Sequence, residues 1–240
     1  MSKVEVYIVV EGQTEQTFVR DILAPAASNQ GLYLYAALIG RSGHKGGDIR
    51  FDRAEKDIGL FLQQRHDTYV STMFDYFRID VDWPGRAEVQ RRIKSGATLT
   101  ARQKAEVLEV AMQREIEKTF PRSNAKHRFI PYVEMHEFEA LLFSDARILA
   151  DKIDIDISEI HRILDQHGEP EEINDDPQQA PSKQIIALNE RYRKVAMGKA
   201  IAEAIGIVTL RKKCSHFHEW LIKLEAIATG RDTKQEKGQC

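Results

Sequence analysis

The sequence predicts an α/β protein with a mainly parallel sheet, helices on both faces of that sheet, and a helical C-terminal part. Strand-like and helix-like runs alternate through residues 1–145, which is typical of a parallel sheet. From Ser144 onward the apolar spacing is helical. Apolar residues make up 42% of the chain and charged residues 30%, an ordinary balance for a globular protein. We therefore expect an α/β core over 1–145, a helical part over 146–230 packed on that core, and a polar tail over 231–240.

The first elements alternate as strand, helix and strand. Val4–Val10 is almost continuously apolar and β-branched, which predicts a buried central strand. Glu11–Glu15 turns that strand directly into a helix that ends near Pro25. Leu32–Ile39 predicts a second strand. Four glycines in 40–47 indicate a loop.

The same alternation continues beyond this loop. Ile49–Gln64 is expected to be a helix, and Tyr69–Phe77 a third strand. Thr100 and Gln103 have the spacing of a capping box and start a long helix. His127–Met135 is expected to be a fourth strand. The acidic, polar stretch Gly168–Pro181 is expected to be a flexible surface connection.

The charge balance, the length of the apolar runs and the cysteines indicate which partners and which cellular compartment to expect. Lys and Arg number 35 against 37 Asp and Glu, so contacts with nucleic acid would depend on local basic patches. No apolar stretch approaches the ~20 residues that a membrane span needs, and Val4–Val10 is too short for a signal peptide. Cys214 and Cys240 are an unlikely disulfide pair, which favours a reducing compartment. We expect a soluble, cytoplasmic protein that does not bind membranes.

Acidic side chains follow the ends of the predicted strands. Glu11 and Asp75 end the first and third strands, Glu137 and Glu139 follow the fourth, and Glu15 lies about one helical turn beyond Glu11. Ligands of parallel sheets bind outside the carboxyl ends of the strands, so these acids converge if the strands are neighbours. Carboxylate oxygens are the ligands that Mg²⁺ and Mn²⁺ prefer. The alternative is that these acids cap helices or lie on an exposed rim.

Two loops contain further candidates. Asp80 and Asp82 lie just beyond the third strand, where they either complete a metal site or solvate the loop. Arg41 and Lys45 lie in the glycine-rich loop, whose backbone can approach an anion closely. They either bind phosphate or are simply solvated.

The segment Val9-Val10-Glu11-Gly12-Gln13-Thr14-Glu15, with a later acid at a strand end, resembles a Toprim domain, the fold of topoisomerases, primases and OLD-type nucleases. Several segments together are similar to an uncharacterised bacterial Toprim-like family often encoded beside ABC or AAA ATPases. These segments are the Glu11–Glu15 start, Lys45-Gly46-Gly47, Thr72-Met73-Phe74-Asp75-Tyr76, Met135-His136-Glu137-Phe138-Glu139-Ala140-Leu141 and His216-Phe217-x-x-Trp220-Leu221.

The resemblance implies Mg²⁺-dependent hydrolysis of nucleic-acid phosphodiesters, with Glu11 and Asp75 as the central pair. Glu15, Glu137 or Glu139 would complete coordination or act as the base. The resemblance also implies an ABC- or AAA-type ATPase as a partner, in defence against phage. A homo-oligomer remains open.

One departure from the Toprim pattern supports other functions. The usual later strand has Asp-x-Asp, but Phe77 follows Asp75 at the position of the second acid. A non-catalytic Toprim-shaped subunit of an ATPase complex is therefore the main alternative. A phosphatase of flavodoxin-like shape is a third reading, although the sequence lacks a Gly-Lys-Ser/Thr phosphate loop or a nucleophile signature.

Overall fold

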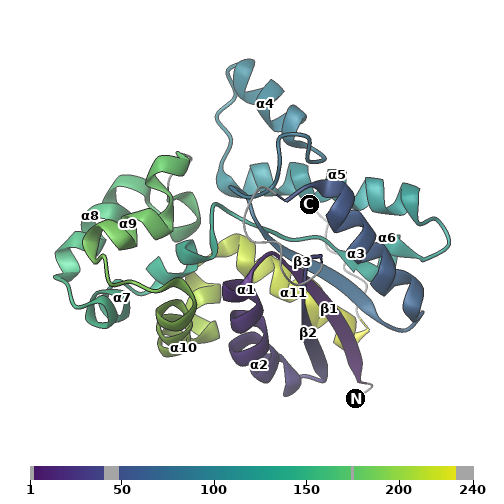
Figure 1. The fold of residues 1–240 in the computed structure, drawn as a ribbon, viewed down its shortest axis with the longest axis horizontal. Helices are drawn as coiled ribbons and strands as arrows, with labels where there is room; N and C mark the ends of the chain where they lie inside the picture. Colours follow the sequence, from purple (N-terminus) through teal and green to yellow (C-terminus); the bar gives the residue numbers. More distant parts are fainter. Residues whose placement is uncertain (1–2, 41–48, 174–175, 231–240) are drawn as a thin grey trace, which may run out of the picture.

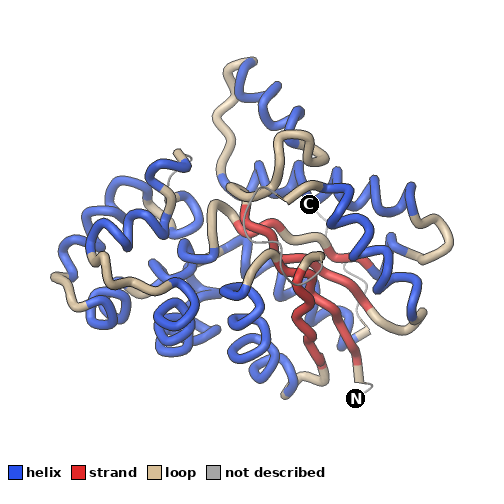
Figure 2. Tube along the Cα trace, viewed as in Figure 1, coloured by secondary structure: helices blue, strands red, loops and turns tan. Residues whose placement is uncertain are grey.

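A computed structural model describes residues 3–40, 49–173 and 176–230 and contains a parallel sheet. Its strands are β1 (Val4–Val10), β2 (Leu32–Leu38), β3 (Tyr69–Asp75), β4 (Phe129–Ile130) and β5 (Val133–Glu134). The order is β2-β1-β3-β4, with β5 also paired to β3, and every pairing is parallel. The predicted α/β class and its parallel sheet are confirmed (Figures 1 and 2).

Helical segments follow every strand except β4, which leads directly to β5, and helices make up most of the later chain. The α-helices are α1 (Gln13–Phe18), α2 (Ala24–Ser28), α3 (Phe51–Gln64), α4 (Arg86–Lys94), α5 (Ala101–Thr119), α6 (Ala125–Arg128), α7 (Ala146–Ile153), α8 (Ile157–His167), α9 (Pro181–Leu188), α10 (Lys194–Lys213) and α11 (Ser215–Thr229). Shorter turns of other helical types are η1 (Val19–Leu23), η2 (Phe138–Ser144), η3 (Pro170–Glu172) and η4 (Pro177–Gln179). None of the described helices is long and apolar enough to cross a bilayer.

The sheet separates two apolar cores. Val6, Ile8 and Val10 point to one face, where they pack with residues of α1, η1, η2, α7, α8, α10 and α11. Val9 and Phe74 point to the other face, which is covered mainly by α3 and α5. This alternation follows from the two-residue period of a strand. In Figure 1, α7 to α10 gather to the left of the sheet and α11 passes behind it.

Helix α11 joins the C-terminal part to the centre of the sheet. The Trp220 ring stacks on Tyr132, with the ring centroids 4.3 Å apart. The indole N–H of Trp220 donates to Ser71 Oγ on β3 at 2.9 Å. The indole therefore buries its apolar surface and still satisfies its only hydrogen-bond donor. The late helices and the early strands thus share one core.

The predicted fourth strand is wrong in extent. His127 and Arg128 belong to α6, and only Phe129–Ile130 and Val133–Glu134 pair with β3. Pro131 lies between these short strands and has no N–H to donate to a ladder. The third strand is also shorter than expected. It ends at Asp75 and continues as a turn.

The expected surface connection over 168–181 is partly buried, which is a second correction. Glu171 and Ile173 are buried, and the Glu171 carboxylate accepts the backbone N–H groups of His216 and Phe217 at 2.9 and 2.8 Å. Glu171 therefore satisfies unpaired N–H donors at the start of α11. Hydrophobic spacing gave no sign of this contact, because it joins segments that are distant in the chain.

Two helix starts show how local residues define the fold. The capping box predicted for α5 is present, since Thr100 and Gln103 each bond to the other's backbone N–H. Helix α4 was not predicted. It begins after Gly85, which has a φ of 88° and whose missing Cβ would lie 2.8 Å from the Val107 carbonyl oxygen. Only glycine fits this turn without strain.

Candidate functional site

The carboxyl ends of β1 and β3 bring Glu11 and Asp75 together. The two strands are parallel neighbours, with Val10 opposite Met73. Glu11 therefore lies one residue beyond its strand, beside the last residues of β3. The backbone N–H of Asp75 points to Glu11 Oε2 at 3.4 Å. The prediction that these strands are neighbours and that these acids meet at one edge is confirmed.

Glu15 folds back towards the same turn. Gly12 caps α1, and a Cβ at this position would lie 3.0 Å from Glu15 Oε2. A side chain at residue 12 would therefore crowd the carboxylate. Glu15 is 5% exposed although it lies in the first turn of a helix. The Glu-Gly-x-Thr-Glu segment thus places two carboxylates on one tight strand-to-helix turn.

Glu137 and Glu139 reach this edge from the turn after β5. Between them, the backbone N–H of Phe138 donates to Asp75 Oδ1 at 3.1 Å. Glu139 is 1% exposed and Glu137 is half-buried. They are not held on a regular strand, because β5 has already ended and η2 begins at Phe138. The turn nevertheless brings both acids beside Asp75.

Negative charge accumulates in this cluster. Burial raises the pKa of Asp75 well above its usual value, and Glu11, Glu15, Glu139 and Glu137 raise it further. Burial, followed by the charge of Glu15, raises the pKa of Glu11 to about 7. Burial also raises the pKa of Glu139 to about 8. Not all of these carboxyl groups can therefore be ionised together at neutral pH, and a bound cation would reduce the repulsion between them.

Two basic side chains offset part of this charge. Arg78 Nε lies 2.8 Å from Glu11 Oε1. Lys194 Nζ lies 3.3 Å from Glu137 Oε2 and 3.6 Å from Glu139 Oε2. Sequence reasoning missed both. Arg78 follows Asp75 closely and could have been considered from that spacing, whereas Lys194 begins α10 and has no local link to the acids.

Glu134 is a further acid that sequence reasoning did not single out. It lies on β5 opposite Asp75 in register and is fully buried. The Tyr132 hydroxyl donates to Glu134 Oε2 at 2.7 Å. Burial and the charge of Glu171 raise the pKa of Glu134 well above its usual value. The alternation of Glu134 with Tyr132 and His136 along the chain could have indicated a polar face. Glu134 lay inside the expected strand His127–Met135, however, and was not considered.

The remaining candidates do not join the cluster. Asp82 is exposed, and Asp80 lies in a turn where its N–H donates to the Ile49 carbonyl at 3.0 Å. Neither is among the principal acids that raise the pKa of Asp75. Arg41 and Lys45 lie outside the described residues. Phe77, where the Toprim pattern has an acid, packs instead against His136, with ring centroids 5.2 Å apart.

The donor chemistry fits a hard divalent cation, but the side chains are not arranged as a finished ligand set. Within the described ranges, no three Asp, Glu, His or Cys side chains are placed to hold a metal together. Arg78 bonds to Glu11 and the Phe138 N–H bonds to Asp75. Glu139 Oε1 is buried without a hydrogen-bond partner among the described residues. Oxygen donors with surplus negative charge suit Mg²⁺ or Mn²⁺.

Comparison with known proteins identifies a family. Residues 10–225 match the family described as a domain of unknown function (DUF4276), so the chain belongs to that family. No curated protein and no solved structure matches the chain. The family is uncharacterised, as expected, while its relation to Toprim domains, to OLD-type nucleases and to neighbouring ATPases stays a prediction.

Proposed function

We propose that this member of the DUF4276 family is a metal-dependent nuclease that hydrolyses phosphodiester bonds of nucleic acid. The observation that carries the proposal is the convergence of Glu11, Glu15, Asp75, Glu137 and Glu139 at the carboxyl edge of the sheet. Burial and mutual repulsion raise the pKa of Asp75, Glu11 and Glu139. Perturbed acids at the end of parallel strands are typical of a functional site.

Glu11 and Asp75 are the side chains we expect to hold Mg²⁺ or Mn²⁺, with Glu15 or Glu137 completing the set. When bound, the ion would polarise the phosphoryl group and lower the pKa of a coordinated water. Glu139 suits the role of general base once a bound cation lowers its pKa from about 8 towards neutrality, because its carboxylate form can then accept a proton.

Lys194 supplies the positive charge of the proposed mechanism. Its side chain is 45% exposed, so it can contact both the acids and a substrate at the rim. With a divalent ion balancing the carboxylates, Lys194 would be available to a phosphate oxygen. Stabilising charge that develops on the phosphoryl group is a main source of rate in phosphoryl transfer.

The wider setting is proposed from the resemblance alone. A cytoplasmic nuclease controlled or delivered by an ABC- or AAA-type ATPase, in defence against phage, fits the Toprim-like interpretation of the sequence. Arg41 and Lys45 would contact phosphate in that setting.

The experiment combines cleavage with metal binding. Purified protein is incubated with single- and double-stranded DNA and RNA in Mg²⁺, Mn²⁺ or EDTA. We expect cleavage only with metal, and no cleavage by Glu11→Gln or Asp75→Asn. The matched control is Glu203→Gln, which removes an exposed acid from α10. Cleavage that survives both substitutions, or that persists in EDTA, would overturn the proposal.

A specific observation favours a second function, that of a non-catalytic binding subunit. The main oxygens of the cluster already have partners, since Arg78 bonds to Glu11 and the Phe138 N–H bonds to Asp75. Phe77 also provides no second acid. This function predicts a thermal midpoint that does not respond to Mn²⁺. The nuclease predicts that Mn²⁺ raises the midpoint of the wild type and leaves that of Glu11→Gln almost unchanged.

A further inference from the structure

A cavity of about 570 Å³ lies at the edge of the sheet, far along β3 from the acidic cluster. Its walls come from α5 and α11, and its floor comes from the start of β3 and from β4. The apolar part of the lining includes Tyr69, Val110, Ile130, Pro131 and Ile227. This size and mixed lining are typical of sites for small organic molecules.

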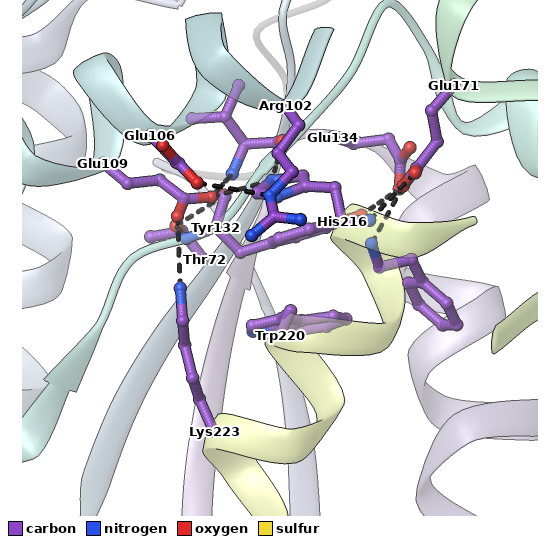
Figure 3. Close-up of polar contacts among 12 residues, drawn as sticks. Thr72, Arg102, Glu106, Glu109, Tyr132, Glu134, Glu171, His216, Trp220 and Lys223 are labelled. Carbon is purple, nitrogen blue, oxygen red and sulfur yellow. Dashed lines mark hydrogen bonds and ion pairs between the residues drawn. The ribbon is translucent and has the colours of Figure 1, made fainter. Parts of the chain in front are cut away.

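The two carboxylates in the lining are balanced by residues outside it. Glu106 pairs with Arg102 at 3.2 Å, and Arg102 also pairs with Glu219 at 2.7 Å. Glu109 is 5% exposed, and its Oε1 lies 3.0 Å from His216 Nε2. The backbone N–H of Val133 donates to the same oxygen at 3.1 Å. Figure 3 shows this arrangement, with His216 and Tyr132 lying above Trp220. Neither carboxylate therefore needs a cation from a ligand.

The lining also contains Lys126 and Lys223, which equal the two carboxylates in number, and His216 gives Glu109 a basic partner from outside the lining. Lys223 rises from α11 towards Glu109, as Figure 3 shows, but its Nζ stays 3.5 Å from Glu109 Oε2. The Lys223 side chain is 44% exposed. An ammonium group has three donors, so this long contact leaves it with donors for another partner. Lys126 is exposed on α6, which also contributes to the lining.

We propose that this cavity binds a small organic anion whose apolar body rests on Val110, Ile130 and Ile227 and whose acidic group bonds to Lys223. The proposal does not depend on the nuclease activity, because the cavity shares no residue with the acidic cluster. A carboxylate or a phosphate monoester on an aromatic or short aliphatic body has the required chemistry. A charge-assisted hydrogen bond at a partly covered lysine supplies selectivity for the anion.

Anion binding and Glu109 compete for the same ammonium group. Replacing Glu109 by Gln keeps an acceptor for the Val133 N–H but removes the charge that attracts Lys223. We therefore expect Glu109→Gln, a substitution inside the buried network, to tighten binding of the anion in the cavity. An uncharged ligand of the same shape, which cannot bond to the ammonium group, would not respond in this direction.

The probe is the amphiphilic anion 1-anilinonaphthalene-8-sulfonate, titrated by fluorescence, with the uncharged N-phenyl-1-naphthylamine as its partner probe. We expect one sulfonate probe to bind per chain. Lys223→Met keeps the apolar stem and should weaken that binding about tenfold, the scale of one charge-assisted hydrogen bond. It should leave the uncharged probe unaffected. Lys199→Met is the matched control, since Lys199 is also a partly exposed lysine paired with an acid, Asp21.

A second pair of variants tests the place of binding without altering the network. Val110 is 49% exposed on the α5 wall, so either charge is tolerated there. Val110→Lys should tighten binding of the sulfonate probe, and Val110→Glu should weaken it. Glu109→Gln, which does alter the network, should also tighten binding of the sulfonate probe severalfold. Equal affinity in the Lys and Glu variants, or undiminished affinity in Lys223→Met, would overturn the proposal, as would failure of the wild type to bind the probe.

Discussion

Glu109 on α5 and Asp75 at the end of β3 are both buried carboxylates, yet their surroundings shift their pKa values in opposite directions. Glu109 has His216, Lys223 and the Val133 N–H as partners, and its pKa is lowered despite its burial. Asp75 lies among other acids, and its pKa is raised well above the usual value. The first arrangement stabilises the fold, whereas the second is costly unless a cation neutralises the acids. Burial alone therefore does not separate a structural acid from a functional one.

The largest effect should come from Asp75. Asp75→Asn removes the charge at the centre of the acidic cluster while keeping an acceptor for the Phe138 N–H. We expect metal-dependent cleavage to fall to the level of the EDTA control, measured on labelled single-stranded DNA. Adding Glu11→Gln should cause no further loss, because ligands of one ion act as a unit.

The control for this experiment is folding rather than activity. Asp75→Asn should retain the far-ultraviolet circular dichroism and the urea midpoint of the wild type, or exceed that midpoint. Removing one of several repelling acids from a metal-free site rarely destabilises a fold. Full cleavage by Asp75→Asn would remove Asp75 from the mechanism.

Glu109 should show the opposite pattern. Glu109→Ala leaves His216 buried without its counter-charge and the Val133 N–H without its acceptor. Breaking a buried ion pair in this way costs about 3–5 kcal/mol of unfolding free energy. Urea denaturation measures the loss, and Glu106→Ala on the exposed side of α5 is the control. A loss below about 1 kcal/mol would show that Glu109 does not stabilise the fold through His216 and Val133.

An effect of intermediate size is expected in the pH dependence of the unfolding free energy, which should differ between Glu11 in the acidic cluster and Glu109. The pKa of Glu11 rises from 4.5 to about 7 on folding. The protonated form therefore stabilises the fold fully below pH 4.5, and this contribution is lost as the pH rises through 7. Glu11→Gln imitates the protonated form, so it should match the wild type near pH 4.5 and be more stable by about 1–3 kcal/mol at pH 8.

Urea unfolding in EDTA at the two pH values measures this difference. Glu109 provides the comparison, because its pKa is lowered on folding and its contribution is lost as the pH falls. A Glu11→Gln variant that is less stable than the wild type at pH 8 would mean that the Arg78 ion pair outweighs burial and repulsion.

The smallest effect should come from Lys223. Its contact with Glu109 spans 3.5 Å and is open to solvent, so Lys223→Met should cost below about 1 kcal/mol. Urea unfolding of Lys223→Met and Glu109→Ala measures both losses of unfolding free energy under the same conditions. A loss as large as that of Glu109→Ala would show that Lys223, rather than His216, is the main counter-charge of Glu109.

The sequence was sufficient for features that depend on local pattern. The apolar run of β1, the capping box of α5 and the acids at the ends of β1 and β3 all follow from periodicity and strand-end position. The parallel order of β1 and β3 then brings Glu11 and Asp75 together without further information.

Features that depend on contacts between distant segments could not be predicted. Lys194 joins the acidic cluster only because α10 packs against the turn after β5, and Glu171 becomes buried only because α11 needs acceptors for its first N–H groups. The split of the fourth strand at Pro131 was visible in principle, since proline interrupts a ladder. The apolar residues on both sides of Pro131 concealed it.

The contact between Trp220 and Ser71 has a consequence for how the chain is made. The two residues are 149 positions apart, so β3 leaves the ribosome long before its covering helix exists. At roughly 5–20 residues per second, the interval is about 7–30 seconds. During that time one apolar face of the sheet stays open, and the acids at its edge lack Lys194. A nascent chain of this protein therefore exposes an apolar surface and an incomplete acidic cluster until α11 is synthesised. We expect chaperones to bind the chain mainly during that interval.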